Sequence, residues 1–158
     1  MPSQVLTEQA LATRAFASLL RAHATATQKL NAQLLSDHGL TLSDFEVLLR
    51  LARAPERRMR RVDLAEQVLL TASGVTRLLD GLERSGLVER GACATDRRVV
   101  YAVLTDAGLA AFRAAAESHL PQVDDLFGSR LEELELERLV ELLSRLGDAD
   151  APDCSPPE

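Results

Sequence analysis

The sequence lacks the features of membrane, secreted and zinc-binding proteins. No apolar run approaches the roughly 20 residues that a membrane helix needs. The N-terminal residues show no charged start followed by an apolar run, so we expect no signal peptide. Its two cysteines, Cys93 and Cys154, are too few and too far apart for a disulfide framework or a zinc module. We therefore expect a protein of the reducing cytoplasm without a membrane partner.

Aromatic residues are also scarce, which limits the kind of core the chain can build. They make up 3% of the 158 residues and include no tryptophan, whereas hydrophobic residues make up 46%. A core of Leu, Val and Ala suits packing of helix on helix better than a sandwich or a barrel. The length is that of about one domain, so we expect one mainly helical (α+β) unit.

Motifs for catalysis and metal binding are missing as well. The histidines His23, His38 and His119 are scattered, and no Cys-x-x-Cys or His-Glu-x-x-His spacing occurs. The chain has no glycine-rich phosphate loop and no Gly-x-Ser-x-Gly elbow. The sequence thus predicts neither an enzyme nor a cofactor.

The net charge of −6 argues against nucleic-acid binding only until it is divided along the chain. Residues 50–101 contain eleven Arg and seven Asp or Glu, a balance of +4, whereas the remaining residues have a balance of −10. A local positive surface can attract phosphates on an acidic protein. An Arg-rich, solvated middle segment without a partner would give the same counts.

The spacing of apolar residues and the capping signals predict an order of elements. Helices are expected over residues 6–35, from Thr41 or Ser43 to Pro55, and over 62–69, 72–84, 106–127 and 129–146. Residues 56–61 are interpreted as a basic connector, too short for a helix and too charged for a core strand. Residues 87–90 and 98–104 predict a hairpin around a polar turn. This order is typical of a winged helix-turn-helix between terminal helices.

Three segments carry a family resemblance over nearly the whole chain. They are Arg61-Val-Asp-Leu-Ala-Glu-Gln, Val75-Thr-Arg-Leu-Leu-Asp-Gly-Leu-Glu-Arg-Ser-Gly-Leu-Val-Glu-Arg90 and Asp96-Arg-Arg-Val-Val-Tyr-Ala-Val-Leu-Thr105. The last contains an Asp-x-Arg wing signature. With these segments the sequence resembles the MarR family of bacterial transcriptional regulators. The resemblance implies a repressor that binds a pseudo-palindromic site on double-stranded DNA as a homodimer.

The predicted domains follow from this order. Residues 1–40 form an N-terminal helix of the dimerisation region, because its apolar stripe is longer than one small domain can cover. Residues 41–105 form the winged helix-turn-helix domain that binds DNA. Residues 106–147 form C-terminal dimerisation helices, and the proline-containing tail 148–158 is expected to be disordered.

The candidate DNA contacts lie in three places. The second helix of the helix-turn-helix begins with small and polar residues that suit close approach to a major groove. In the wing, the resemblance implies that Asp96 steadies Arg98, which enters a minor groove beside a phosphate-binding Arg97. The connector adds backbone contacts. The predicted set is Thr71, Ala72, Ser73, Gly74, Thr76, Arg77, Asp96, Arg97, Arg98, Arg60 and Arg61. A helix cap with solvated surface charges is the alternative interpretation.

Ligand sensing is predicted less directly. His23 lies on the apolar stripe of the first helix, where the family binds small phenolic or other aromatic effectors, and Arg21, Thr27 and Arg50 are weaker candidates. The alternative is a core histidine that is hydrogen-bonded across the dimer. We favour it because histidines in such positions are more often structural than ligand-binding. Two other functions stay open: a thiol-based redox sensor through Cys93, and a winged-helix interaction module without affinity for DNA.

Overall fold

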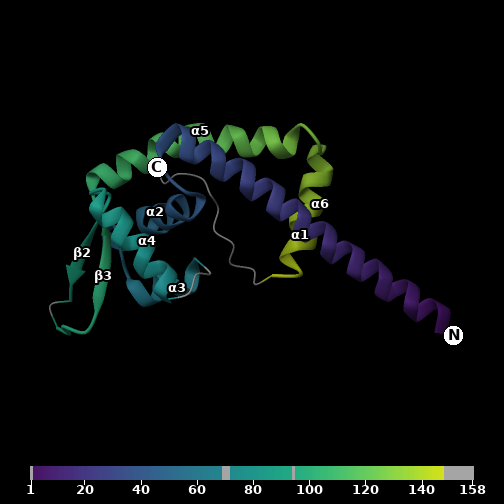
Figure 1. Ribbon diagram of the computed structural model, residues 1–158, viewed down its shortest axis with the longest axis horizontal. Coiled ribbons are helices and arrows are strands. Elements are labelled where there is room, and N and C mark those ends of the chain that lie inside the picture. Colours follow the sequence, from purple (N-terminus) through teal and green to yellow (C-terminus); the bar gives the residue numbers. More distant parts are fainter. Residues whose placement is uncertain (1, 69–71, 94, 148–158) are drawn as a thin grey trace.

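The chain forms a small lobe from which two long helices extend (Figure 1). The computed structural model describes residues 2–68, 72–93 and 95–147. The elements are α1 (Pro2–His38), α2 (Leu42–Arg53), a 3-10 turn (Pro55–Arg57), β1 (Arg58–Arg60), α3 (Arg61–Gln67), α4 (Ala72–Arg84), β2 (Val88–Ala92), β3 (Val100–Leu104), α5 (Asp106–Gly128) and α6 (Glu133–Ser144). This order confirms the predicted winged helix-turn-helix between terminal helices. The turn between α3 and α4 and the C-terminal tail lie outside the described residues.

Local capping signals set several of the helix boundaries. Thr41 is the N-cap of α2, and its hydroxyl accepts a hydrogen bond from the backbone N–H of Asp44 at 3.0 Å. The carboxylate of Asp44 accepts one in return from the Thr41 N–H at 2.8 Å, which completes a capping box. Gly39 follows α1 with a φ of +67°, a conformation that favours glycine. Of the two starts predicted for α2, the structure therefore selects Thr41.

The prediction of a connector over residues 56–61 was wrong. Residues 58–60 form the edge strand β1, antiparallel to β3, with Met59 opposite Ala102. Met59 packs against the core, whereas Arg58 and Arg60 on either side of it are exposed. One apolar residue between two charged ones suits an edge strand with one face on the core. Three residues are too few, however, to reveal the two-residue periodicity of a strand in the sequence.

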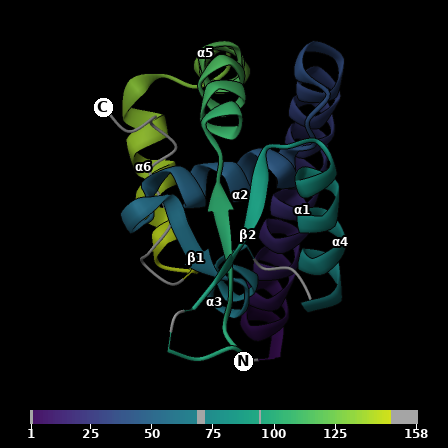
Figure 2. The ribbon, with the colours of Figure 1, turned by 90° about the vertical axis from the view of Figure 1, so that its left-hand side faces the viewer.

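The sheet places β3 between β1 and β2 (Figure 2). β2 and β3 form the predicted hairpin, with Val88 opposite Leu104 and Ala92 opposite Val100. The loop between them, which includes the described residues 95–99, is the wing. Both strands begin one or two residues later than predicted, because the positions before them belong to the turn after α4 and to the wing.

The core lies where α2 meets α4, α5 and the sheet. Phe45 of α2 and Phe112 of α5 are almost fully buried, and their ring centroids are 5.3 Å apart. Leu64 of α3 and Leu79 of α4 are fully buried in the same cluster. The core therefore fixes both helices of the helix-turn-helix on α2 and α5.

The two terminal helices keep much of their apolar surface outside this core. Among the described residues, α6 buries no side chain, and α1 contributes Leu30 and Leu34 from its C-terminal half. Large apolar side chains exposed on the two helices are Leu11, Phe16, Leu19, Leu20, Leu35, Leu134, Val140, Leu142 and Leu143.

The start of α6 differs from the prediction. Ser129 belongs to the end of α5, and Glu132 is the N-cap of α6 in a capping box with Glu135. The Glu132 backbone N–H donates to the Glu135 carboxylate at 3.0 Å. A carboxylate at the first turn also suits the helix dipole. None of the described helices combines the length and apolar character required to cross a membrane.

Gly108 allows α5 to begin directly against the turn that ends α4. Thr105, the N-cap of α5, donates its hydroxyl to the carbonyl of Gly86 at 2.7 Å. A Cβ on Gly108 would lie 2.0 Å from the carbonyl oxygen of Leu87, which is too close for any non-bonded contact. Only glycine therefore fits there without movement of the backbone.

We expect Gly108→Ala to lower the free energy of unfolding by about 1–3 kcal/mol, the range for overpacking in a close-packed site. Gly81→Ala is the matched control, because its Cβ would meet nothing within 4 Å in the interior of α4. The control should raise the free energy of unfolding by about 0.5–1 kcal/mol through helix propensity. Urea unfolding at one protein concentration measures both. Equal effects of the two substitutions would contradict this packing.

His119 makes the stability of the core depend on pH. Its side chain is 5% exposed, its ring lies 4.7 Å from that of Phe45, and its Nδ1 is buried without a hydrogen-bond partner among the described residues. Burial lowers the pKa of His119 below its ordinary value because the charged form is poorly solvated there.

The unfolded chain should bind a proton at His119 more readily than the folded chain. Stability should therefore fall as pH drops below the ordinary histidine pKa of about 6.5, by no more than about 1.4 kcal/mol for each pH unit from this residue. His119→Phe should lose less stability than the wild type between pH 7.5 and 5.5, as urea unfolding would show. Parallel pH profiles for the two proteins would show that the imidazole is not responsible.

Candidate nucleic-acid interface

The recognition-helix candidate α4 has one buried and one exposed face. Val75, Leu79 and Leu82 pack into the core. Ser73, Thr76 and Arg77 are exposed on the opposite face, with Gly74 half-buried. α4 begins at Ala72, and Thr71 lies outside the described residues. The structure therefore presents the predicted polar positions of α4 on one outward surface.

The wing presents Asp96, Arg97 and Arg98 together, all exposed. The Asp96 carboxylate accepts a hydrogen bond from the backbone N–H of Arg98 at 2.9 Å, and its carbonyl accepts one from Val99 at 3.1 Å. Asp96 thus holds the turn through the backbone, as an aspartate does in an Asx-turn. The guanidinium of Arg98 extends from a turn whose shape Asp96 determines.

Several arginines of the basic segment are neutralised by acidic neighbours. The ion pairs are Arg57 with Asp106 at 2.9 Å, Arg58 with Glu56 at 3.5 Å, Arg60 with Asp63 at 2.7 Å, and Arg61 and Arg90 with both Asp80 and Glu83. Arg58 also lies over the ring of Tyr101, 4.4 Å from its centroid. The hydrogen bond and charge of Asp63 raise the pKa of Arg60, so this guanidinium stays charged but already has a partner.

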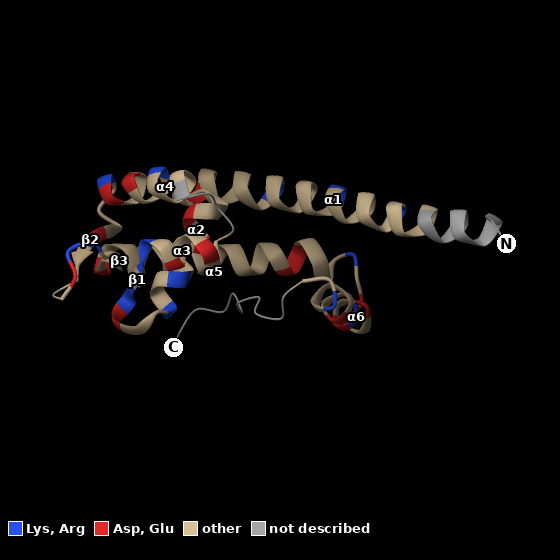
Figure 3. Cartoon of the chain, turned by 90° about the horizontal axis from the view of Figure 1, so that it is seen from below, with Lys and Arg blue, Asp and Glu red and all other residues tan. Residues whose placement is uncertain are grey.

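Other arginines of the segment have no such partner. Among the described residues, none forms an ion pair or side-chain hydrogen bond with the guanidinium of Arg77, Arg97 or Arg98. Figure 3 shows Lys and Arg interleaved with Asp and Glu around α3, α4 and the sheet, whereas α1 and α5 are largely uncharged. The local excess of positive charge is therefore available at the exposed face of α4 and at the wing.

Arg60 and Arg61, the predicted connector contacts, occupy different positions. Arg60 is exposed on β1 and bound to Asp63 through two hydrogen bonds. The Arg61 side chain is 20% exposed and faces α4. Contact of either residue with DNA stays a prediction, and the structure gives each an intramolecular partner.

The hollow beside α4 was not predicted. It has a volume of about 790 Å³ and is lined by Arg77, Asp80, Glu83, Arg84 and Arg90. The spacing of Asp80 and Glu83 on one side of the helix was visible in the sequence. Arg90 was taken only as the end of a strand, and nothing local in the sequence shows that it reaches α4.

The predicted ligand residues are partly brought together. His23 and Thr27 line an open hollow of about 790 Å³ between α1 and α2. The other lining residues are Ala24, Gln28, Asn31, Leu42, Ser43 and Glu46. Arg50 borders this hollow through Glu46, at 3.4 Å, and also donates to the carbonyl of Gln67. Arg21 is exposed on α1 and does not line it.

Cys93 lies at the start of the wing loop and is partly exposed. Its Sγ is 3.3 Å from the Thr95 hydroxyl. Hydrogen bonds from the Thr95 side chain and from the backbone of Thr95 and Asp96 lower the pKa of the thiol, because they stabilise the thiolate. Cys154 lies outside the described residues. A redox role for Cys93 stays a prediction.

Comparison with known proteins gives consistent similarities. A model described as the MarR family matches residues 38–99. The HTH-type transcriptional regulator MhqR of Bacillus subtilis is 30% identical over 142 residues, which cover 90% of this chain and 94% of that protein. The HTH-type transcriptional repressor YetL of the same species is 30% identical over 108 residues, covering 68% and 64% of the two chains.

A solved structure agrees in fold over most of the chain. It is the crystal structure of a MarR family transcriptional regulator from Streptomyces coelicolor in complex with DNA. Its TM-score is 0.81 at 28% sequence identity, and the match covers 89% of this chain and 88% of that one.

Proposed function

This chain belongs to the MarR family of DNA-binding transcriptional regulators, and we propose that it represses transcription as a homodimer on a pseudo-palindromic operator. The observation that carries the proposal is the unpaired state of Arg77 on α4 and of Arg97 and Arg98 on the wing, within the described residues. Neighbouring arginines form ion pairs with acidic residues of the same chain, whereas these three expose their positive charge to solvent. The similar regulator from Streptomyces coelicolor in complex with DNA supports this use of the fold.

The two surfaces suit different grooves. The exposed face of α4 begins with small and polar residues, so the helix can enter a major groove closely, with Arg77 reaching a base edge or a phosphate. Arg98 on the wing suits an adjacent minor groove, where narrow stretches concentrate negative potential. Repression would follow from occupation of a promoter, and the similarity to the repressor YetL supports this sign of regulation.

The exposed apolar faces of α1 and α6 support assembly with a second copy. Phe16 is 62% exposed on α1, and Leu134 and Leu142 are 76% and 40% exposed on α6. Large apolar side chains exposed in this way are typical of an interaction site. Closed two-fold symmetry would present two copies of α4, which requires two half-sites about one helical turn apart.

Loss of the unpaired arginines should weaken DNA binding. We expect Arg77→Ala and Arg98→Ala each to lower affinity for an operator duplex by about tenfold or more, which is 1–3 kcal/mol for a specific contact. Each lost phosphate contact should also reduce the slope of log K against log salt by about 0.9. Fluorescence anisotropy titrations at several salt concentrations measure both quantities.

Arg113→Ala is the matched control, because Arg113 is exposed on α5, outside α4 and the wing. It should leave affinity and slope nearly unchanged. Equal binding by the wild type and the Arg77→Ala/Arg98→Ala double variant would show that the interface is elsewhere. Failure of the wild type to bind any duplex would favour a protein-interaction module.

The hollow between α1 and α2 supports an effector site for small phenolic acids. His23 and Thr27 both line it, and it adjoins the helix that carries the exposed apolar face. A ligand there would regulate only if it bound two states of the dimer with different affinities.

Effector binding can be tested by thermal shift with a set of phenolic acids. Any compound that raises the melting temperature of the wild type should lose that effect in His23→Ala. Arg21→Ala is the control, since Arg21 does not line the hollow. An equal shift in His23→Ala, or no shift with any compound, would contradict the site.

A further inference from the structure

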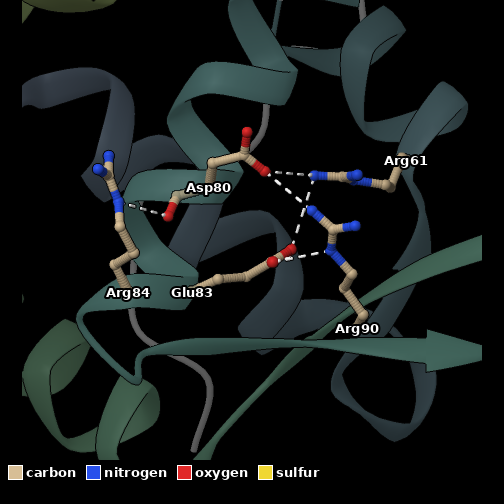
Figure 4. A network of polar contacts seen from close by, with 5 residues as sticks. All are labelled: Arg61, Asp80, Glu83, Arg84 and Arg90. Carbon is tan, nitrogen blue, oxygen red and sulfur yellow. Dashed lines mark hydrogen bonds and ion pairs between the residues drawn. The ribbon is translucent and has the colours of Figure 1, made fainter.

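Four charged side chains from three elements meet beside the recognition helix (Figure 4). Asp80 and Glu83 come from α4, Arg61 is the first residue of α3, and Arg90 lies in β2. Arg90 bonds to Glu83 at 2.8 Å and to Asp80 at 3.0 Å, and Arg61 lies 3.6 Å from both carboxylates. This four-residue charge cluster links the helix-turn-helix to β2, the strand that precedes the wing.

The four side chains of the cluster differ in how far they are exposed to solvent. The side chains of Arg61 and Glu83 are 20% and 21% exposed, whereas those of Asp80 and Arg90 are 44% and 58% exposed. Nη2 of Arg61 is buried and has no hydrogen-bond partner among the described residues, so the two carboxylates are its charge compensation. Loss of these carboxylates would leave a buried cation uncompensated, and Arg61 would be driven toward the surface.

The carboxylates oppose attraction to DNA. Asp80 and Glu83 line the same hollow as Arg77, the candidate DNA contact, so they add negative charge where phosphates are expected. They also accept hydrogen bonds from Nε and Nη2 of Arg90, two donors that would otherwise suit a phosphate. An acidic pair at this place reduces sequence-independent affinity, which depends on the number of phosphates neutralised.

We propose that Asp80 and Glu83 are positioning residues that increase sequence discrimination. They withhold Arg61 and Arg90 from non-specific phosphate contacts, and they hold α4 at a fixed angle to the wing strand β2. Specific binding then relies on α4 and the wing tip, which carry the unpaired arginines. This inference rests on the proposed DNA-binding function.

The test compares two duplexes and one pair of variants. The wild type first selects a duplex from a random library, and a scrambled duplex of equal length and composition serves as non-specific DNA. Asp80→Asn should bind the scrambled duplex several-fold more tightly and should lower the ratio of specific to non-specific affinity by about tenfold. Glu89→Gln is the matched control, because it removes one negative charge from an exposed position of β2 outside the cluster.

The salt dependence separates a positioning role from a direct one. In the wild-type background, Arg90→Met should leave the salt slope on the scrambled duplex unchanged, because Arg90 is bound to the carboxylates. In the Asp80→Asn/Glu83→Gln background, the same substitution should lower the slope by about 0.9, because the released guanidinium contacts a phosphate there. Melting temperatures of all variants verify folding. If the double background does not fold, the affinity ratio of Asp80→Asn on the two duplexes decides.

Three results would overturn the proposal. In the first, Arg90→Met lowers the slope in the wild-type background, so that Arg90 contacts phosphate directly. In the second, Glu89→Gln changes the affinity ratio as much as Asp80→Asn, so that net charge is the cause. In the third, Asp80→Asn leaves the ratio unchanged. Failure of the wild type to select any duplex would overturn the DNA-binding function itself, before any variant is compared.

Discussion

The packing of α2 against α5 is the contact on which the rest of the structure depends. Phe45 and Phe112 bury their rings against each other, and the leucines of α3 and α4 pack on the same cluster. α5 begins directly after β3 and continues away from the lobe beside α1 (Figure 1). One core therefore holds α4, the sheet and the first half of α5. Because this core is close-packed, a shift of α5 is coupled to a shift of α4.

Acidic residues determine which arginines of the basic segment keep an unpaired positive charge. Most of the seven acidic residues within residues 50–101 form ion pairs with particular arginines, such as Asp63 with Arg60 and Glu56 with Arg58. Neutralised arginines stabilise the lobe locally, although exposed pairs contribute little free energy. Within residues 50–101, Arg77 on α4 and Arg97 and Arg98 on the wing have no acidic partner among the described residues. Selective pairing, more than total charge, therefore determines where the surface can attract phosphates.

Sequence reasoning identified most of the fold because its signals are local. Helix periodicity and caps such as Thr41 depend on neighbours within a few positions, and the structure confirms them. β1 was missed because three residues are too short to display alternation, and because its pairing with β3 joins distant parts of the chain. The start of α6 was misplaced because its N-cap is Glu132, and glutamate is not among the residues that typically cap a helix.

The candidate site was predictable only in part, for the same reason. Arg77 and Arg98 could be proposed as DNA contacts from the helix face and the wing signature. The contact of Arg90 with Glu83 joins a strand to a helix through the tertiary fold, and no spacing rule indicates it. The hollow around His23 likewise depends on how α1 crosses α2. When the partner of a side chain is distant in sequence, only the structure shows the contact.

The central claim is that two copies of α4 and of the wing bind one face of a DNA duplex. Hydroxyl-radical footprinting of the wild type on its selected duplex tests this claim most directly. The account predicts two protected patches, symmetric about the centre of the site and about one helical turn, or 10 base pairs, apart. A single asymmetric patch, or uniform protection along the duplex, would contradict it.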